Sequence, residues 1–307
     1  PDMLFYPAVK QLTLDLAAVS FLGENIGANV ENVKTAFVNM VAAAVSVIRK
    51  PLPFTQMAKG VAGRQFMIDY FGGQIDARRK GDGEDLFSHL CKATTDDGSL
   101  LTRQEIIDHM SFLMMAAHDT LTSSLTSFVW FLASNPDWQQ KLREEIAGLG
   151  LGKDEPLPYE RLDDLPLTEM AFKESLRLIP PVPSIPRCAV RDTEFAGFKL
   201  PAGTRVSVNP VYTHNMPDVW VDPETFDPLR FSNEASRNRH KFAFVPFGGG
   251  AHMCLGLNFA YMQAKCFAHR LLSTAQVTVA PGYIPDWKLW PIPQPKDGLR
   301  VRIEPLG

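Results

Sequence analysis

The sequence has few cysteines and no excess of charge of either sign. Its four cysteines, among 307 residues, form no C-x-x-C pair and no closely spaced set, so neither a disulfide-rich scaffold nor a zinc ribbon is indicated. The 31 basic and 34 acidic side chains give a net charge of -3, which excludes a global positive field that would attract nucleic acid. Scattered cysteines are typical of a reducing compartment, and we expect a cytoplasmic protein.

Long apolar runs are also missing. The closest one, residues 36–48, is shorter than the ~18 to 20 residues that span a bilayer, and it contains Asn39 and Ser46. The chain opens on Pro1 rather than on methionine, and residues 5–22 have the pattern of a packed helix rather than of a signal peptide. We therefore expect further sequence upstream, in which a membrane anchor would not be visible.

The chain is rich enough in apolar residues, at 45%, to bury a large core. Apolar residues recur at helical spacing in the first half, whereas proline, glycine and β-branched residues in 182–208 and 276–304 indicate short strands. Helices are expected over residues 9–21, 33–48, 54–79, 85–92, 102–133, 137–146, 167–178 and 256–274, with irregular chain over 210–232. Because no repeat is present, we predict a single domain over residues 1–307, mainly α with a small β part.

Two local signals refine the helices. Thr102 and Glu105 have the spacing of a capping box at the start of the longest predicted helix. The helix expected over 137–146 has a polar face that we expect to be solvated, consisting of Gln139, Gln140, Arg143 and Glu144.

The strongest functional signal is a glycine-rich loop around one cysteine, F-G-G-G-A-H-M-C-L-G, over residues 247–256. Three consecutive glycines let the backbone approach a flat group closely. Cys254 is expected at the start of the following helix, where backbone N–H groups and the helix dipole stabilise a thiolate. A thiolate on iron pushes electron density towards bound dioxygen and favours O–O cleavage. A structural cysteine or a phosphate loop would be the alternatives, but no G-K-[ST] follows the glycines and no strand and acidic residue typical of dinucleotide sites accompany them.

This stretch resembles the haem-binding loop of the cytochrome P-450 family, F-x-x-G-x-x-x-C-x-G, at every fixed position. The resemblance implies haem b with Cys254 as the iron ligand, and with Phe247, Gly248 and Gly256 in contact with the cofactor. It also implies a soluble bacterial-type member that is truncated at its N-terminus. His252 stands where the family has an arginine or histidine that meets a haem propionate, although a solvated loop histidine would look the same.

Other family elements occur upstream in the expected order. Glu174 and Arg177, on one helical face, match the E-x-x-R motif, and Arg230 matches the arginine of P-x-R-F, with Leu229 in place of a common glutamate. As a surface pair Glu174 and Arg177 would contribute little. The resemblance implies instead a buried structural cluster of one carboxylate and two guanidiniums. Arg187 matches a further arginine that pairs with a haem propionate.

The longest helix carries A-A-H-D-T over residues 116–120, which resembles the oxygen-activation motif [AG]-G-x-[DE]-T. The resemblance implies that Ala116 leaves room at the haem and that Asp119 and Thr120 relay protons. A mid-helix threonine that bonds back to a carbonyl is the alternative. Ala117 replaces a glycine, and Leu121 replaces a frequent second threonine, which weakens the case for a two-hydroxyl relay. The sequence does not determine which way the side chain of residue 118 faces.

The family resemblance implies a monooxygenase that inserts one atom of O₂ into a hydrophobic substrate such as a fatty acid, terpenoid or sterol-like molecule. The residues expected to line its pocket are mainly apolar: Phe112, Met115, Ala116, Val182, Ser184 and Ile185.

The sequence contains no flavin or nicotinamide motif, so we expect electrons from an external donor such as a ferredoxin. A basic patch, Arg237, Arg239 and Lys241, with Lys265 and Arg270 nearby, is predicted to receive an acidic ferredoxin or flavodoxin-like protein. A solvated, charge-rich loop would give the same pattern.

Two other functions remain open. A haem-thiolate isomerase or peroxygenase would dispense with the oxygen-activating threonine, so Asp119 and Thr120 favour the monooxygenase. A non-catalytic fragment that binds haem weakly is the second, because the family's N-terminal strands and its W-x-x-x-R helix are not in this sequence, whose first tryptophan is Trp130.

Overall fold

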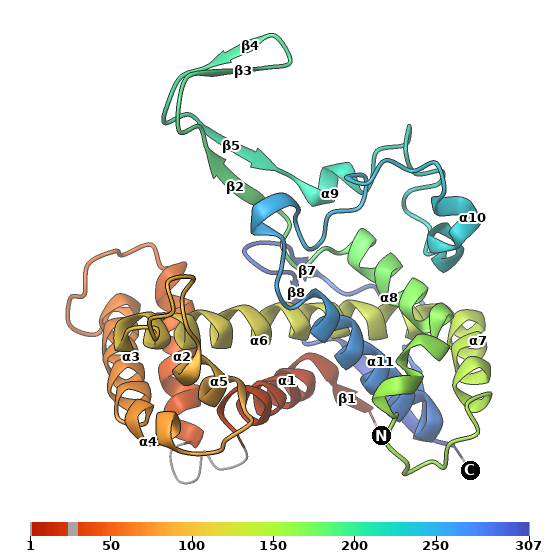
Figure 1. Ribbon diagram of the computed structural model, residues 1–307. Coiled ribbons are helices and arrows are strands. Elements are labelled where there is room, and N and C mark those ends of the chain that lie inside the picture. Colours follow the sequence, from red (N-terminus) through yellow and green to blue (C-terminus); the bar gives the residue numbers. More distant parts are fainter. Residues whose placement is uncertain (1, 24–29, 307) are drawn as a thin grey trace. The chain divides into compact units, whose positions relative to one another are not determined.

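The computed structural model describes residues 2–23 and 30–306 (Figure 1). The chain forms two compact units, one of Lys10–Asp119 and the other of Pro1–Val9 with Thr120–Gly307. The division falls within two helices, α1 (Phe5–Leu22) and α6 (Arg103–Ser134). The sequence-based expectation of one domain did not anticipate this division.

The unit of Lys10–Asp119 is helical. Besides parts of α1 and α6 it contains α2 (Val30–Ala44), α3 (Gln56–Gly72), α4 (Ile75–Lys80) and α5 (Leu86–Lys92). The single helix expected over 54–79 is wrong, because adjacent glycines at 72 and 73, which have low helix propensity, end α3. The expected extension of α2 to residue 48 is also wrong. The hydroxyl of Ser46 donates to the carbonyl of Ala43 at 2.9 Å and competes with further helix.

Helices α2 and α3 approach each other through small residues. A Cβ at Gly63 would lie 2.6 Å from the carbonyl oxygen of Ala36, and one at Gly60 would lie 2.2 Å from the Cβ of Ala43. Only glycine fits at these two positions without a shift of the facing helix.

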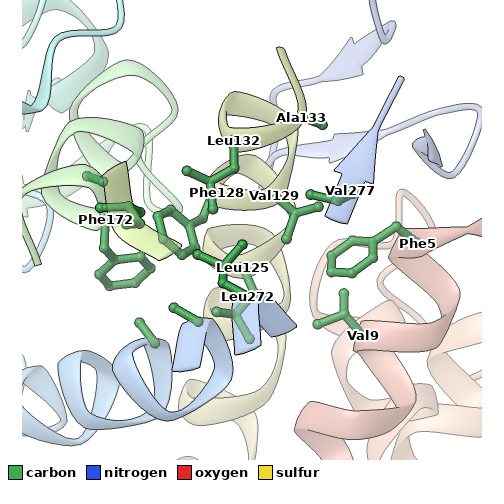
Figure 2. Close-up of a cluster of buried hydrophobic side chains, with 14 of the residues drawn as sticks. Phe5, Val9, Leu125, Phe128, Val129, Leu132, Ala133, Phe172, Leu272 and Val277 are labelled. Carbon is green, nitrogen blue, oxygen red and sulfur yellow. The ribbon is translucent and has the colours of Figure 1, made fainter. Parts of the chain in front are cut away.

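The helix α6 is the longest in the chain, at 32 residues. Its start confirms the predicted capping box: the Glu105 N–H donates to Thr102 Oγ1 at 3.2 Å, and the Thr102 N–H donates to the Glu105 carboxylate at 2.7 Å. Further along, Leu125, Phe128 and Leu132 are buried in the hydrophobic core of the second unit (Figure 2).

The helices that follow α6 along the chain belong to the same unit. They are α7 (Pro136–Ala147), α8 (Pro166–Leu178), α9 (Pro210–Thr213), α10 (Asn233–Ser236) and α11 (Leu257–Thr274), with 3-10 turns at Tyr159–Asp164, Pro228–Phe231 and Gly250–His252. The segment expected to be irregular, 210–232, thus begins with α9 and contains one of these turns. Two adjacent prolines at 180 and 181 follow α8 and prevent its continuation.

Short antiparallel strands form the β part. One sheet has the order β1 (Asp2–Leu4), β9 (Arg300–Pro305) and β6 (Ala275–Thr278). Three two-stranded ribbons pair β2 (Ile185–Cys188) with β5 (Arg205–Val208), β3 (Thr193–Phe195) with β4 (Phe198–Leu200), and β7 (Trp287–Lys288) with β8 (Gln294–Pro295). The expected fold class, mainly α with a small β part, is confirmed.

Gln139 corrects the expectation that the polar face of α7 is solvated throughout. Its side chain is buried, donates to the carbonyl of Val277 at 2.8 Å and accepts from the Val277 N–H at 3.0 Å. The amide thereby satisfies the N–H and the C=O of Val277 on the side of β6 that does not face β9.

Candidate functional site

The cysteine loop is the segment 247–256, which precedes α11. Gly248 and Gly250 both have a φ of 71°, a conformation that glycine adopts without strain. The Cys254 N–H donates to the carbonyl of Phe247 at 2.9 Å and closes the loop, and the thiol is exposed. Because α11 begins at Leu257, the cysteine lies three residues before the helix rather than at its first turn.

Aromatic rings connect this loop to the core. The ring centroid of Phe247 lies 5.5 Å from that of Tyr261 on α11. The Tyr261 centroid lies 5.9 Å from that of Phe172 on α8, and the Phe172 centroid lies 5.7 Å from that of Phe128 on α6. Burial, together with the charge of Glu169, raises the pKa of Tyr261, so this phenol stays neutral. The loop therefore contacts α11 directly and is connected through it to α8 and α6.

Glu174 lies at the centre of a buried ionic cluster. Arg177 donates to its carboxylate from Nε at 2.7 Å and from Nη2 at 2.8 Å, and Arg230 donates from Nε at 3.2 Å. The Asp227 N–H adds a further bond at 3.0 Å. The side chains of Glu174 and Arg177 are fully buried, and that of Arg230 is 10% exposed. The forked geometry satisfies a carboxylate that would otherwise be costly to bury.

Sequence reasoning missed His214, which joins this cluster to the cysteine loop. Its buried imidazole lies 3.2 Å from the carbonyl oxygen of Arg177 and accepts the Val245 N–H at 2.9 Å. The sequence around it offers no recognisable motif, since the contact is made between segments 31 and 37 residues apart.

Cationic and apolar groups accompany the loop. Arg187 lies on β2 and is exposed, as is His252 in the loop itself. Ile185, also on β2, approaches the loop so closely that a Cβ at Gly248 would be 4.0 Å from its Cδ1. Two further pocket candidates, Val182 and Ser184, are half-buried just before this strand, and Ser184 Oγ lies 2.5 Å from the hydroxyl of Ser207.

The oxygen-activation motif falls on uninterrupted helix. Asp119 contacts His118 Nδ1 at 3.1 Å and Lys10 Nζ at 3.5 Å. Burial would raise the pKa of Asp119, but the hydrogen bond from His118 and the charge of Lys10 outweigh it and lower that pKa. His118 is itself buried against Phe37, so it faces the interior of the Lys10–Asp119 unit.

The neighbouring motif residues are more open. Phe112 and Met115 are 57% and 38% exposed, and Ala116 and Thr120 are half-buried. Phe112, Met115, Ala116 and Asp119 recur at the spacing of one helical face.

The predicted basic patch is only partly available to a partner. Arg237 and Lys241 are exposed, but the guanidinium of Arg239 lies 4.1 Å from the ring centroid of Trp220 and donates to the carbonyl of Arg230 at 2.6 Å. Burial lowers the pKa of Arg239. Its role as a docking charge is a wrong expectation, because the side chain is used inside the fold.

Two more basic residues named with the patch are also engaged. Lys265 is 4% exposed and pairs with Glu169 at 2.6 Å, and Arg270 pairs with Asp154 at 2.9 Å. Lys265 in particular cannot contact a partner, since its charge is neutralised in the interior.

These groups fit a haem. An exposed thiol suits an iron ion, the N–H donors of Arg187 and His252 suit two carboxylates, and the side chains of Ile185 and Leu255 offer apolar contact to a macrocycle. A Cβ at Gly250 would meet no atom within 4 Å, so the space beside this glycine is open. Among the described residues, no group of three or more His, Cys, Asp or Glu side chains could hold a metal ion.

Comparison with known proteins agrees with the motifs. The family model described as cytochrome P-450 matches residues 12–296. The chain belongs to the cytochrome P-450 family. It is 40% identical over 307 residues to the putative cytochrome P-450 136 of Mycobacterium tuberculosis, covering 98% of this chain and 62% of that protein. It is also 34% identical over 235 residues to the taurochenodeoxycholic 6 alpha-hydroxylase of Sus scrofa, covering 76% of this chain and 46% of that protein.

A solved structure shows the same fold. The retinoic acid-bound cyanobacterial CYP120A1 superposes with a TM-score of 0.89 at 34% identity, covering 99% of this chain and 70% of the other. The chain thus spans only part of the length of these relatives, from 46% of the Sus scrofa enzyme to 62% of the Mycobacterium protein and 70% of the cyanobacterial structure. Within the described residues, no helix has the length and apolar character that a bilayer crossing requires.

Proposed function

We propose that this chain carries the haem-thiolate site of a monooxygenase that inserts one atom of O₂ into a hydrophobic substrate. The observation that supports the proposal most strongly is the exposed Cys254 thiol on a loop that is closed by its own backbone bond and packed against the core through Phe247. A thiolate in such a loop is held at one position before any cofactor arrives, and this preorganisation favours binding.

Each residue of the cysteine loop and its surroundings would have a separate role in binding the cofactor. Cys254 would bind the iron, Phe247, Gly248 and Gly256 would contact the cofactor near the thiolate, and His252 and Arg187 would pair with its propionates. A haem bound through a thiolate supplies activation of dioxygen.

Proton delivery would fall to the middle of α6. Asp119, whose lowered pKa keeps its carboxylate ionised between turnovers, would accept a proton only transiently and would relay protons together with the hydroxyl of Thr120. Lys10 and His118 contact the same carboxylate oxygen and would fix its orientation.

A hydrophobic substrate of the fatty acid, terpenoid or sterol-like class is our proposal, because most of the residues that the sequence predicts for the pocket are apolar. Phe112, Met115, Ala116, Val182 and Ile185 are apolar, with Ser184 as the polar exception. The names of two relatives are consistent with this class, since one structure holds retinoic acid and one enzyme hydroxylates a bile acid.

Electrons would come from an external protein, for which a ferredoxin is our proposal. The exposed cations Arg237 and Lys241 remain as docking charges for an acidic donor. The isomerase or peroxygenase alternative is disfavoured by the adjacent Asp119 and Thr120, which those reactions do not need. The alternative of a non-catalytic fragment that binds haem weakly is tested by measuring turnover in the haem-loaded chain.

The test is the absorbance of the reduced, carbon monoxide-bound chain reconstituted with haem. We expect a band at roughly 450 nm, which reports thiolate ligation, and its loss in Cys254→Ser. The matched control is Cys188→Ser, which removes another exposed thiol and should leave the band in place. An identical spectrum for wild type and Cys254→Ser would defeat the proposal.

A further inference from the structure

His214 follows α9 and is fully buried, and its ring centroid lies 5.3 Å from that of Phe244. Its two ring nitrogens face different partners. Nδ1 lies 3.2 Å from the Arg177 carbonyl oxygen, and Nε2 lies 2.9 Å from the Val245 nitrogen. A neutral imidazole has one donor and one acceptor nitrogen, so the partners decide which is which.

The end of α8 fixes the tautomer. Within a helix the Arg177 carbonyl would accept a bond from the residue three or four positions on, but those residues are Pro180 and Pro181, which have no N–H. The carbonyl therefore needs an outside donor, and Nδ1–H of His214 is placed to supply it. Nε2 then carries the lone pair and accepts the Val245 N–H.

The imidazole thus connects the buried ionic cluster to the cysteine loop. Arg177, which chelates Glu174, also donates from Nη1 to the carbonyl of His214 at 2.8 Å. Val245 lies two residues before Phe247, whose carbonyl accepts the Cys254 N–H. The geometry points to His214 as a positioning residue that holds the cysteine loop through Nε2 and releases it when the imidazole is protonated. The functional meaning of this inference rests on the proposed role of Cys254.

Protonation would place an N–H of His214 against the N–H of Val245, and the bond would be lost. Burial lowers the pKa of His214 from 6.5 to about 4, and the nearby positive charge of Arg177 acts in the same direction, while the Arg177 carbonyl opposes them. Arg177 on α8 and Glu174 behind it are the charged groups on that side, and the segment just before the cysteine loop contributes Phe244 and Val245, which do not titrate.

The direction of the pH dependence follows from these two pKa values. The closed loop requires the neutral imidazole, so the stabilisation of the loop by His214 is complete above pH 6.5 and weakens as the pH falls towards about 4. The difference between these two values corresponds to a factor of roughly 300 in the opening equilibrium.

Two amide variants separate the two nitrogens. In His214→Gln the side-chain oxygen can occupy the place of Nε2 and accept from Val245, whereas in His214→Asn the amide reaches only the place of Nδ1. Neither amide titrates. His269→Asn is the matched control, since His269 is likewise buried, in the same unit, on α11.

The measurement is amide hydrogen exchange, followed by mass spectrometry, of loop peptides covering 243–256 in the full chain without added haem. At pH 7 we expect His214→Asn to exchange roughly tenfold faster than wild type, from one lost buried bond, with His214→Gln and His269→Asn close to wild type. After correction for intrinsic rates, wild-type protection should fall between pH 6.5 and 4, and protection in His214→Gln should not.

Two results would overturn the inference: unchanged loop exchange in His214→Asn, or equally fast exchange in His214→Gln. A uniform rise that includes peptides of α2 and α3 would also overturn it, because it would indicate a general loss of stability. In the haem-loaded chain, the band at roughly 450 nm should weaken in His214→Asn and persist in His214→Gln. If that band does not depend on Cys254, the proposed function fails while the exchange result still decides the role of His214.

Discussion

Neutralising Glu174 is the sharpest test of the core behind the cysteine loop. The carboxylate accepts three bonds from two guanidiniums and one from a backbone N–H, and it is fully buried. In Glu174→Gln the side chain keeps its shape but loses its charge, and an NH₂ group, which is a donor, replaces one carboxylate oxygen and faces Arg177. Two buried cations then lack a counter-charge, which costs about 3 to 5 kcal/mol.

The loss is large against a total stability of about 5 to 15 kcal/mol. At about 2 to 4 °C per kcal/mol for large domains, the melting temperature should fall by roughly 6 to 20 °C. Urea unfolding monitored by tryptophan fluorescence would report the same change as a lower midpoint with an unchanged slope. The control is Asp108→Asn, which removes an ion pair to Arg64 whose two side chains are more than half exposed and should cost less than about 1 kcal/mol. A loss below 1 kcal/mol in Glu174→Gln would refute the reasoning.

Three further outcomes are expected. Gly63→Ala should destabilise the Lys10–Asp119 unit by about 1 to 3 kcal/mol, since the new Cβ would meet the Ala36 carbonyl oxygen, and an unchanged urea midpoint would contradict the close helix packing. Asp119→Asn should lower the urea midpoint at pH 7. Because the pKa of Asp119 is lowered in the fold, the stability advantage of the wild type is present above the ordinary aspartate pKa of 3.8 and should vanish as the pH falls through the lowered pKa; an advantage that persists in acid would be inconsistent with this. Charge reversal of Arg237 and Lys241 to Glu should slow reduction by an acidic ferredoxin and weaken its salt dependence, measured by stopped flow at several ionic strengths; unchanged rates would exclude this docking face.

The sequence was sufficient for features that depend on neighbours in the chain. The capping box of Thr102 and Glu105 and the helical pairing of Glu174 with Arg177 are set by a spacing of three residues, and both contacts are present. The end of α3 was missed because the apolar pattern continues past Gly72 and Gly73, although helix propensity falls there.

Features that depend on distant partners were not predictable. Gln139 looked like surface because its neighbours on α7 are polar, and its burial is decided by β6, which lies 138 residues further along the chain. Arg239 and Lys265 looked like free charges for the same reason, since Trp220 and Glu169 are not near them in sequence. Motifs identified the groups that carry the chemistry, while the contacts that hold them required the fold.

The aromatic contacts behind the cysteine loop have a consequence for folding order. Phe247 packs on Tyr261, and through it on Phe172 and Phe128, so the loop is supported by segments more than a hundred residues apart. Contacts of such long sequence separation form late, because the closure entropy must be offset first by the packing of the helices. We therefore expect the thiol of Cys254 to reach its final position only after α6, α8 and α11 have assembled, so that a newly made chain would become competent for haem at the end of folding rather than during it.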